Sequence, residues 1–307
     1  MKQVIVVTGA TGHVGRALAE RLISGGQTVR GVARGTEKLG PLAARGAEVR
    51  PGSLDDRAFL TGVFRGAAGV FAMLPPHYSA LDARAEQKKI AESIVGAIRE
   101  SGVTHVVSLS SFGAELPDKT GPIAGLHVFE ELLDKVAGLS VVHLRAAYFM
   151  ENHLGSIGLI RSAGINGGAI KPDVAIPMVA TRDIAAVAAQ YLTKLDFKGR
   201  NIRYVLGQKD CTMTQATRIL GAAIGKPGLE YVELAEPDFK KGLIGAGFSP
   251  NLADLFVEMS RGLNTGLIKG ESRSKANTTP TTLEEFAETV FEPAFKAATS
   301  PQPASAR

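Results

Sequence analysis

The sequence predicts an α/β protein, a Rossmann-type doubly wound parallel sheet with a smaller, less regular C-terminal substrate lobe. Three observations lead to this prediction. Short β-branched runs alternate with longer helical stretches through the first half of the chain. A glycine-rich loop separates the first strand from the first helix. After Tyr148 the alternation gives way to irregular glycine-rich segments such as residues 155–170.

The first half contains six apolar runs that fit buried strands. These are residues 4–8, 28–33, 47–50, 69–74, 104–109 and 140–145. Helical patterns lie between them, at residues 14–24, 36–45, 56–64, 80–101 and 126–136. Parallel neighbours require right-handed crossovers, so few topologies other than a doubly wound sheet remain.

The second half mixes strands and capped helices. Strands are expected at 201–206 and 230–234, and helices at 184–195 and 252–263. Thr212 with Gln215, and Thr282 with Glu285, fit the capping box, which predicts helices starting near Met213 and Leu283. We therefore expect a nucleotide-binding domain at 1–154, with elements at about 175–206 returning to it. A substrate lobe at 155–296 and a flexible tail at 297–307 complete the chain.

Composition excludes several classes of protein. With 45% hydrophobic and 21% charged residues, the 307-residue chain is typical of a globular protein. Cys211 is the only cysteine, and no apolar run reaches the length of a membrane span, which favours a cytoplasmic protein. The net charge of +5 is spread over both halves and there is no Trp, so we expect no nucleic-acid partner.

The loop Gly9-Ala10-Thr11-Gly12-His13-Val14-Gly15 follows the first strand and opens the first helix. Glycine permits a sharp turn and a close approach to a diphosphate, which the helix N-terminus then favours electrostatically. A glycine turn without a ligand is the alternative. In this context the motif predicts dinucleotide binding.

The choice of dinucleotide depends on the residue after the second strand. NAD-binding proteins place an acidic residue there, about 20 residues after the loop. Here Arg34 stands 19 residues after Gly15 (34 − 15), and Lys38 follows one turn later. A guanidinium cannot accept a hydrogen bond from a ribose hydroxyl but can bind a 2′-phosphate. The sequence therefore predicts NADPH over NADH, unless Arg34 is simply a solvated loop residue.

Several segments together resemble a known family. They are TGATGHVG, VRGVARGTEK, GSLDD, SLSSFGA, LRAAYFMENH, VATRDIAAVAA and TTLEEFAETVF, spread over residues 3–296. The chain is similar to the NmrA-like family of atypical short-chain dehydrogenases, and most similar to its quinone oxidoreductases and NADPH azoreductases. The first motif is common to the superfamily, whereas LRAAYFMENH and VATRDIA narrow the resemblance.

This resemblance implies roles for individual residues. Thr11, Gly12, His13 and Val14 would meet the diphosphate, and Arg34 and Lys38 the 2′-phosphate. Ser53 and Leu54 match the segment beside adenine, although relatives often have Asp in place of Ser53. Two further segments match the surroundings of the nicotinamide and the substrate: Met73, Leu74 and Pro75 after the fourth strand, and Tyr148, Phe149 and Asn152 after the sixth.

A catalytic pair is not evident from the sequence. Typical short-chain dehydrogenases use Tyr-x-x-x-Lys on the helix after the fifth strand, where this chain offers His127 and Glu131. His127 could donate a proton to a reduced acceptor, bind the nicotinamide ribose or amide, or form a structural helix pair with Glu131. Ser110 and Ser111 occupy the place of a family hydroxyl near the substrate, or cap a turn. His127 and Ser110 are thus the catalytic candidates.

The remaining candidates are weaker. The histidines lack metal-ligand spacing, so no metal site is expected, and Asp55-Asp56 fits a helix start. An apolar set in the second lobe forms either plain core or part of a substrate pocket. Its members are Leu243, Ile244, Phe248, Leu252, Leu255, Phe256 and Met259.

Two functions follow from these observations. The first is an NADPH-dependent oxidoreductase that passes hydride to a conjugated acceptor such as a quinone or an azo compound. The second is a non-catalytic NAD(P) sensor, because the family also includes regulators and this chain lacks Tyr-x-x-x-Lys. The expected partner is an apolar or aromatic small molecule, without a membrane, and a homodimer is left open.

Overall fold

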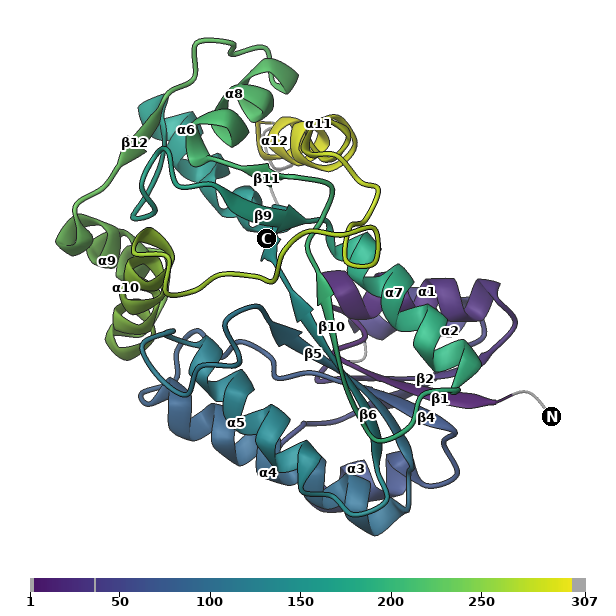
Figure 1. Ribbon diagram of the computed structural model, residues 1–307. Helices are drawn as coiled ribbons and strands as arrows, with labels where there is room; N and C mark the ends of the chain where they lie inside the picture. Colours follow the sequence, from purple (N-terminus) through teal and green to yellow (C-terminus); the bar gives the residue numbers. More distant parts are fainter. Residues whose placement is uncertain (1–2, 36, 300–307) are drawn as a thin grey trace, which may run out of the picture.

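A seven-stranded parallel sheet forms the centre of the molecule (Figure 1). The computed structural model describes residues 3–35 and 37–299. Along the sheet the strand order is β10-β6-β5-β4-β1-β2-β3, and all six pairings are parallel. The strands are β1 (Val4–Thr8), β2 (Thr28–Ala33), β3 (Glu48–Pro51), β4 (Gly69–Ala72), β5 (His105–Ser111), β6 (Ser140–Ala146) and β10 (Arg200–Val205). The predicted doubly wound sheet is confirmed.

The strand order reverses between β1 and β4. The chain runs from β1 through β2 to β3 on one side, then returns to β4 on the other side of β1. In open parallel sheets, ligands bind in the crevice beyond the carboxyl ends of the strands at such a reversal. The topology therefore points to the loops after β1 and β4 before any side chain is considered.

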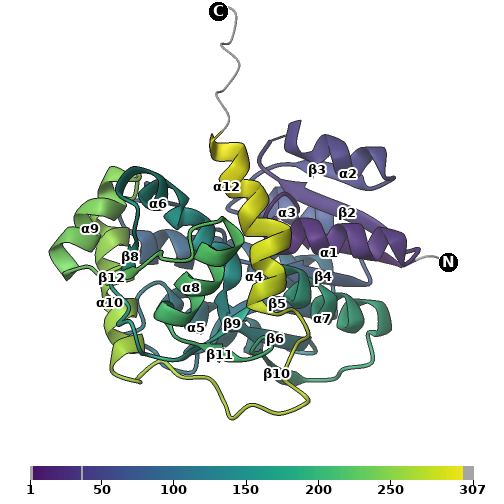
Figure 2. The same ribbon diagram turned by 90° about the horizontal axis from the view of Figure 1, so that it is seen from above.

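Helices cover both faces of this sheet (Figures 1 and 2). One face carries α1 (His13–Ser24), α2 (Gly40–Ala44) and α7 (Thr181–Lys194). The other carries α3 (Arg57–Phe64), α4 (Ala83–Ser101) and α5 (Ile123–Asp134). β10 and α7 thus lie with the first-half elements although they come late in the chain.

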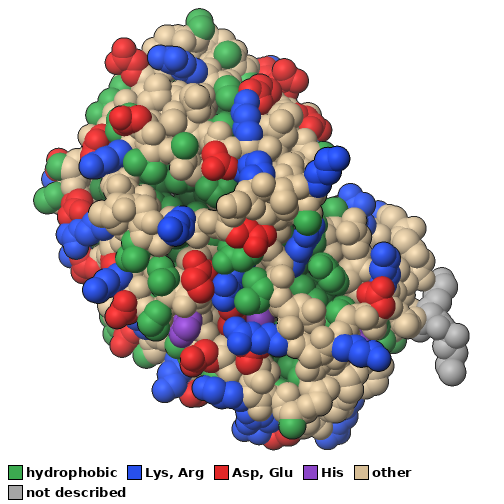
Figure 3. All heavy atoms as spheres, in the orientation of Figure 1, with side chains coloured by type: hydrophobic (Ala, Val, Ile, Leu, Met, Phe, Trp, Pro, Cys, Tyr) green, Lys and Arg blue, Asp and Glu red, His purple; other side chains and the backbone are tan. Residues whose placement is uncertain are grey.

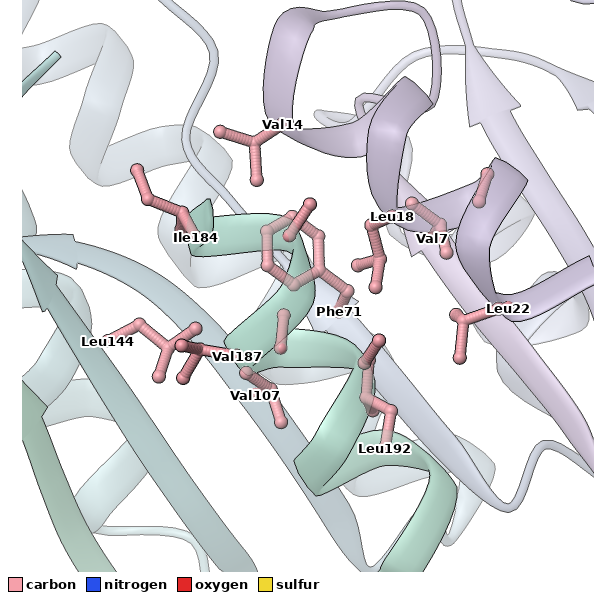
Figure 4. Packing of buried hydrophobic residues seen from close by; sticks show 14 of the residues in the cluster. Val7, Val14, Leu18, Leu22, Phe71, Val107, Leu144, Ile184, Val187 and Leu192 are labelled. Atoms are coloured by element: carbon pink, nitrogen blue, oxygen red, sulfur yellow. The ribbon is translucent and has the colours of Figure 1, made fainter. Parts of the chain in front are cut away.

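The core under α1 and α7 is fully apolar (Figure 4). Val14, Leu18 and Leu22 recur at intervals of four residues on α1 and are buried, because this spacing places them on one helix face. They pack with Phe71 of β4 and Ile184 of α7. Each such buried side chain contributes about 1.5–3 kcal/mol, so this layer fixes the start of α1 against the sheet.

The second lobe has its own small sheets and core. Strands β7 (Tyr148–Phe149), β9 (Ile176–Val179) and β11 (Asp210–Cys211) form one sheet, and β8 (Asn166–Gly168) pairs with β12 (Tyr231–Glu233). A separate buried cluster includes Met178, Leu220, Phe286 and Phe291. The helical elements are η2 (Met150–Ser156), α6 (Ile157–Ala163), α8 (Met213–Ala223), α9 (Glu236–Gly245), α10 (Pro250–Asn264), α11 (Leu283–Phe286), the π turn η3 (Ala287–Phe291) and α12 (Glu292–Thr299).

A buried polar joint ties this lobe to the sheet. The carboxylate of Asp183, at the start of α7, accepts hydrogen bonds from Thr281 N (3.0 Å) and Thr281 Oγ1 (2.7 Å). Glu151 accepts from Thr181 N and Oγ1 at the same helix start. The VATRDIA and TTLEEF segments, far apart in the sequence, are therefore in contact.

Two of the predicted helix caps were confirmed in full and one in part. The capping box of Thr212 and Gln215 is complete, and Asp56 caps α3. Thr282 also caps its helix, but the side chain of Glu285 pairs with Arg182 across the joint. The long-range ion pair thus takes the place of the expected reciprocal cap.

One predicted helix and one predicted strand have other ends in the structure, and each difference has a physical cause. The predicted helix at 36–45 begins at Thr36, which lies outside the described residues. It is divided into the 3₁₀ turn η1 (Glu37–Leu39) and α2, which starts at Gly40-Pro41 because proline cannot continue the preceding turn. The strand expected at 69–74 ends at Ala72, since the N–H of Met73 donates to Thr8 Oγ1 rather than to a neighbouring strand.

The carboxyl-terminal helix extends past the predicted end of the lobe. α12 continues to Thr299, so the first three residues of the expected tail at 297–307 are helical. The buried ring of Phe295 anchors this helix in the second core. Residues 300–307 lie outside the described part of the chain.

Surface charge agrees with the composition. Lys, Arg, Asp and Glu side chains are mixed over the face seen in Figure 3, without a continuous basic area. Within residues 3–35 and 37–299, no helix is long and apolar enough to cross a membrane.

His153 makes the fold sensitive to acid. Its ring is 4% exposed, and among the described residues Nε2 has no hydrogen-bond partner. Burial lowers the pKa of His153 from 6.5 to about 4. Between pH 6.5 and about 4, His153 therefore binds a proton in the unfolded chain but stays neutral in the native protein. The free energy of unfolding falls as the pH drops through this range.

We expect this histidine to account for about 2 kcal/mol of the unfolding free energy lost between pH 7 and pH 5. The His153→Phe variant keeps a ring beside Tyr148, 5.7 Å away between centroids, and removes the titrating group. Urea unfolding at both pH values measures the difference. An equal loss in wild type and variant would contradict the assignment.

Candidate cofactor and substrate site

The glycine loop after β1 is tightly folded onto itself. Gly9 has a φ of +63°, and the N–H of Gly12 donates to the carbonyl of Gly9 at 2.9 Å. A Cβ on Gly15 would lie 2.2 Å from Gly9 O, a backbone atom that cannot move away cheaply. Only glycine fits at this position, as the motif predicts.

Helix α1 starts with its backbone donors available. Its first residue is His13, the N-cap is Gly12, and no side chain caps it. The first turn also contains no acidic residue. A helix start of this kind presents unpaired N–H groups and positive dipole to an anion, which suits the predicted diphosphate contact of Thr11, Gly12, His13 and Val14. The side chain of Val14 is buried, so its contact would be made by the backbone.

The loops after β1 and β4 touch at the point where the strand order reverses. Thr8 Oγ1 donates to Phe71 O at 3.0 Å and accepts from Met73 N at 3.2 Å. A Cβ on Gly9 would lie 2.8 Å from Met73 Sδ. The segment predicted beside the nicotinamide ribose therefore lies directly against the loop predicted for the diphosphate.

Two cations stand where a 2′-phosphate group is expected. Arg34 directly follows β2, and Lys38 lies in the short turn η1. Both are exposed, and neither forms an ion pair within the described part of the chain. Unpaired basic side chains at this edge keep their full capacity for an anionic ligand.

The predicted adenine segment is only partly available. The hydroxyl of Ser53 bonds the carboxylate of Asp55, and this hydrogen bond is the main cause that lowers the pKa of Asp55. Leu54 is 8% exposed and packs in the core beneath α3 and α4. The side chain of Leu54 therefore serves packing, and its backbone is what remains to border a ligand.

A cavity of about 310 Å³ lies at the carboxyl ends of β4, β5 and β6. Both segments that the resemblance associated with the nicotinamide line it, together with the predicted hydroxyl. These predicted residues are Met73, Leu74, Pro75, Ser110, Tyr148, Phe149 and Asn152. Tertiary structure thus brings three separate loops into one wall.

Helix α10 closes the cavity from the second lobe. Of the apolar set found in the sequence, Leu252, Phe256 and Met259 line the cavity. Leu255 and Phe248 instead join a small cluster beside it, with Ala80 and Ala83. One face of α10 therefore lines the cavity, as one of the two interpretations predicted, and Leu255 belongs to the core. Leu243 and Ile244 fit neither interpretation, because Leu243 is half-buried, Ile244 is 41% exposed and neither lines the cavity.

Tyr148 lines the cavity and has a buried phenol. Burial raises the pKa of Tyr148 to about 12, although a hydrogen bond with Asn152 lowers it somewhat. The phenol therefore keeps its proton at neutral pH and can donate a hydrogen bond, while remaining a weak acid.

Ser110 is held by a buried ion pair. Its Oγ donates to Glu130 Oε1 at 2.5 Å, and Arg145 donates to the same carboxylate from Nε (3.1 Å) and Nη2 (2.7 Å). Burial by itself lowers the pKa of Arg145, but its hydrogen bonds with Glu130 outweigh burial and raise it, so Arg145 stays charged. Because its proton is engaged with Glu130, the Ser110 hydroxyl is left to accept a hydrogen bond at the cavity rather than to donate one.

His127 does not line the cavity. Its Nδ1 lies 2.8 Å from Ala114 O and its Nε2 3.6 Å from Glu131 Oε1. Of the three roles open in the sequence, this geometry favours the structural helix pair over the catalytic and cofactor-binding roles. The reason is the rotation of α5, whose Leu126 and Ile123 face the cavity instead.

Sequence reasoning missed three polar residues of the cavity: His77, Glu86 and Gln87. They come from the loop after β4 and the first turns of α4, where no motif marks them. Among the described side chains, no group of three or more metal-ligand types is placed to hold a metal ion.

Comparisons with known proteins agree with this architecture. A sequence profile of the NmrA-like family matches residues 1–287. A (4-alkanoyl-5-oxo-2,5-dihydrofuran-3-yl)methyl phosphate reductase from Streptomyces griseus is 33% identical over 280 residues, covering 91% of this chain and 92% of that protein.

Two solved structures are similar to this chain over most of its length. The NADPH complex of a quinone oxidoreductase from Escherichia coli superposes with a TM-score of 0.80 at 25% identity, covering 94% of this chain and 100% of that one. The NADP(H) complex of a triphenylmethane reductase from Citrobacter sp. gives 0.78 at 22% identity, covering 93% and 99%. At 22% identity the second likeness concerns the fold.

The glycine loop yields a direct test of the site. We expect Gly15→Ala to weaken NADPH binding at least about tenfold, roughly 1.4 kcal/mol, because the added methyl group collides with Gly9 O. Gly62→Ala is the matched control and should bind NADPH normally. Gly62 lies on the exposed face of α3, and no atom lies within 4 Å of the new Cβ. Calorimetry on folded protein measures both, and normal binding by Gly15→Ala would contradict the assignment.

Proposed function

The chain belongs to the NmrA-like family, and we propose that it is an NADPH-dependent reductase of conjugated acceptors such as quinones or azo compounds, which it would bind in the apolar cavity beside the glycine loop. One observation carries the proposal. The two segments expected around a nicotinamide line one apolar cavity beside the glycine loop. A bound dinucleotide would supply a hydride at its nicotinamide ring.

The chain's own residues account for cofactor binding. Backbone donors from Gly12 to Val14 would hold the diphosphate, and Arg34 with Lys38 the 2′-phosphate. Met73 to Pro75 would border the nicotinamide ribose, against the tight Gly9 loop. Within the described residues Arg34 forms no ion pair, so its guanidinium breaks no existing pair when it binds a phosphate. This supports NADPH over NADH.

The cavity favours hydride transfer by alignment and exclusion of water. Its wall is mainly apolar, with Phe149, Phe256 and Met259 facing a space large enough for a small ring system. Hydride transfer to a conjugated acceptor depends mainly on close, aligned contact in a dry site. Tyr148 can donate a hydrogen bond to the acceptor or to the nicotinamide amide, while Ser110 can accept one.

Charge narrows the class of acceptor. Among the described residues that line this cavity there is no Lys or Arg, and Glu86 adds a negative group at its edge. A phosphorylated acceptor, such as the one in the name of the Streptomyces relative, would meet no Lys or Arg there and would face the carboxylate of Glu86. The proposal therefore specifies an acceptor without a phosphate or another anionic group.

A nucleotide sensor is the second candidate. The chain lacks Tyr-x-x-x-Lys, and the pair at the matching positions, His127 and Glu131, lies outside the cavity. A sensor would bind NADPH without oxidising it in the presence of any acceptor.

Cofactor preference can be tested at Arg34. We expect Arg34→Ala to raise the KM for NADPH by about 10- to 100-fold, the loss of a charge-assisted contact, and to change the KM for NADH little. Arg21→Ala, at the far end of α1, is the control. An unchanged preference for NADPH over NADH in Arg34→Ala would refute the role of this guanidinium.

Acceptor class can be tested with the wild-type protein. We expect NADPH to be consumed with neutral quinones and azo dyes. With phosphorylated conjugated lactones we expect at least about tenfold lower kcat/KM, because the phosphate finds no Lys or Arg in the cavity and meets the carboxylate of Glu86. Loss of NADPH absorbance measures both. Tight NADPH binding without consumption across the panel would favour the sensor.

A further inference from the structure

His77 is the histidine that faces the cavity. It follows Pro75-Pro76 in the loop between β4 and α4, and it lines the cavity with Glu86 of α4. We propose that His77, held by Glu86, is the catalytic acid that protonates the acceptor after hydride transfer. This inference rests on the reductase function proposed above.

The loop that carries His77 is well fixed. His77 O accepts from Ala80 N at 3.1 Å, and Tyr78 O accepts from Ser249 N at 2.7 Å. The ring of Tyr78 packs on Phe248, with centroids 4.8 Å apart, next to α10. The second lobe thus fixes the backbone of the loop that carries His77.

Glu86 is placed to stabilise the charged imidazole. Its Oε1 lies 3.7 Å from His77 Nδ1, within ion-pair distance. The other charged groups in this region are paired elsewhere: Arg84 with Glu258 at 2.8 Å, and Lys89 with Asp55 at 2.9 Å. His77 Nε2 has no hydrogen-bond partner in the described part of the chain and remains available to a ligand.

The other polar groups of the cavity are poor proton donors. Tyr148 holds its proton, because burial raises its pKa to about 12. Ser110 directs its proton to Glu130. Gln87 donates from Nε2 to Pro122 O, and an amide does not release a proton near neutral pH. Histidine is the side chain suited to transfer a proton in this range, and His77 is the one that lines the cavity.

The step balances for a quinone. The acceptor receives a hydride from NADPH, which is oxidised by two electrons, and the π electron pair moves onto a quinone oxygen. That oxygen takes the proton from Nε2 of the imidazolium, whose N–H electron pair stays on nitrogen. The side chain of His77 is 46% exposed, so water can restore its proton before the next turnover.

Two kinds of acceptor separate proton transfer from hydride transfer. A quinone needs both a hydride and a proton, whereas a triarylmethane dye cation takes a hydride at its central carbon and becomes neutral without a proton. We expect His77→Gln to lower kcat for the quinone at least about tenfold. General acids usually contribute about 10²–10⁴-fold to a rate. We expect a smaller loss of kcat here, because the hydroquinone anion is itself fairly stable without the proton. With the dye, kcat should stay within about twofold.

The control is His105→Gln. His105 is the first residue of β5, so it lies at the amino ends of the strands, whereas the cavity lies at their carboxyl ends. His105→Gln should behave as wild type with both acceptors. Equal losses with quinone and dye in His77→Gln would indicate a binding or structural role and overturn the proposal, as would no loss with the quinone. If the wild-type protein oxidises NADPH with neither acceptor, the proposed function fails instead.

A binding measurement tests the same group without turnover. The probe is 4-nitrophenol, whose absorbance distinguishes phenol from phenolate, added to protein with NADP⁺. Wild type should bind it as phenolate paired with the imidazolium. His77→Gln should bind the phenolate about 10- to 100-fold more weakly, and Glu86→Gln should bind it less strongly than wild type. A wild-type spectrum without bound phenolate overturns the proposal, whatever the turnover experiment gives.

Discussion

The contact between the ends of β1 and β4 is the constraint on which the site depends. Thr8 Oγ1 bonds both Phe71 O and Met73 N, and Gly9 leaves space for the side chain of Met73. These contacts bring the diphosphate loop and the start of the cavity wall together where the strand order reverses. A side chain at Gly9 would collide with Met73 and push the two loops apart.

The second support is the buried network behind Ser110. Glu130 and Arg145 are both charged and almost fully buried, an arrangement that costs desolvation and is stable only because each hydrogen bond is satisfied. The network acts on the cavity through the hydroxyl of Ser110. Because this hydroxyl donates its proton to Glu130, it is left to accept a hydrogen bond from a ligand. The network therefore determines the polarity of the wall and links β5, α5 and β6 behind it.

The C-terminal lobe contributes its function through two contacts with the first half. The joint of Asp183 with Thr281 fixes the lobe to α7. The packing of α10 on the loop after β4 places Phe256 and Met259 on the cavity, and the same packing fixes Tyr78 and its neighbour His77. The cavity is thus built at an interface between the lobes, where ligand pockets commonly form.

Hydrophobic periodicity and a turn that requires glycine were enough to predict the sheet and the glycine loop from the sequence. Part of the cavity wall, at Met73 to Pro75 and at Tyr148, was predicted from the family resemblance instead. The sequence also showed the spacing of His127 and Glu131, which do lie 3.6 Å apart, but not the direction in which α5 presents them. Only the tertiary structure placed His127 against Ala114 and His77 on the cavity. Helix rotation and loop path are set by packing between segments as distant as Tyr78 and Phe248, and no local pattern encodes such contacts.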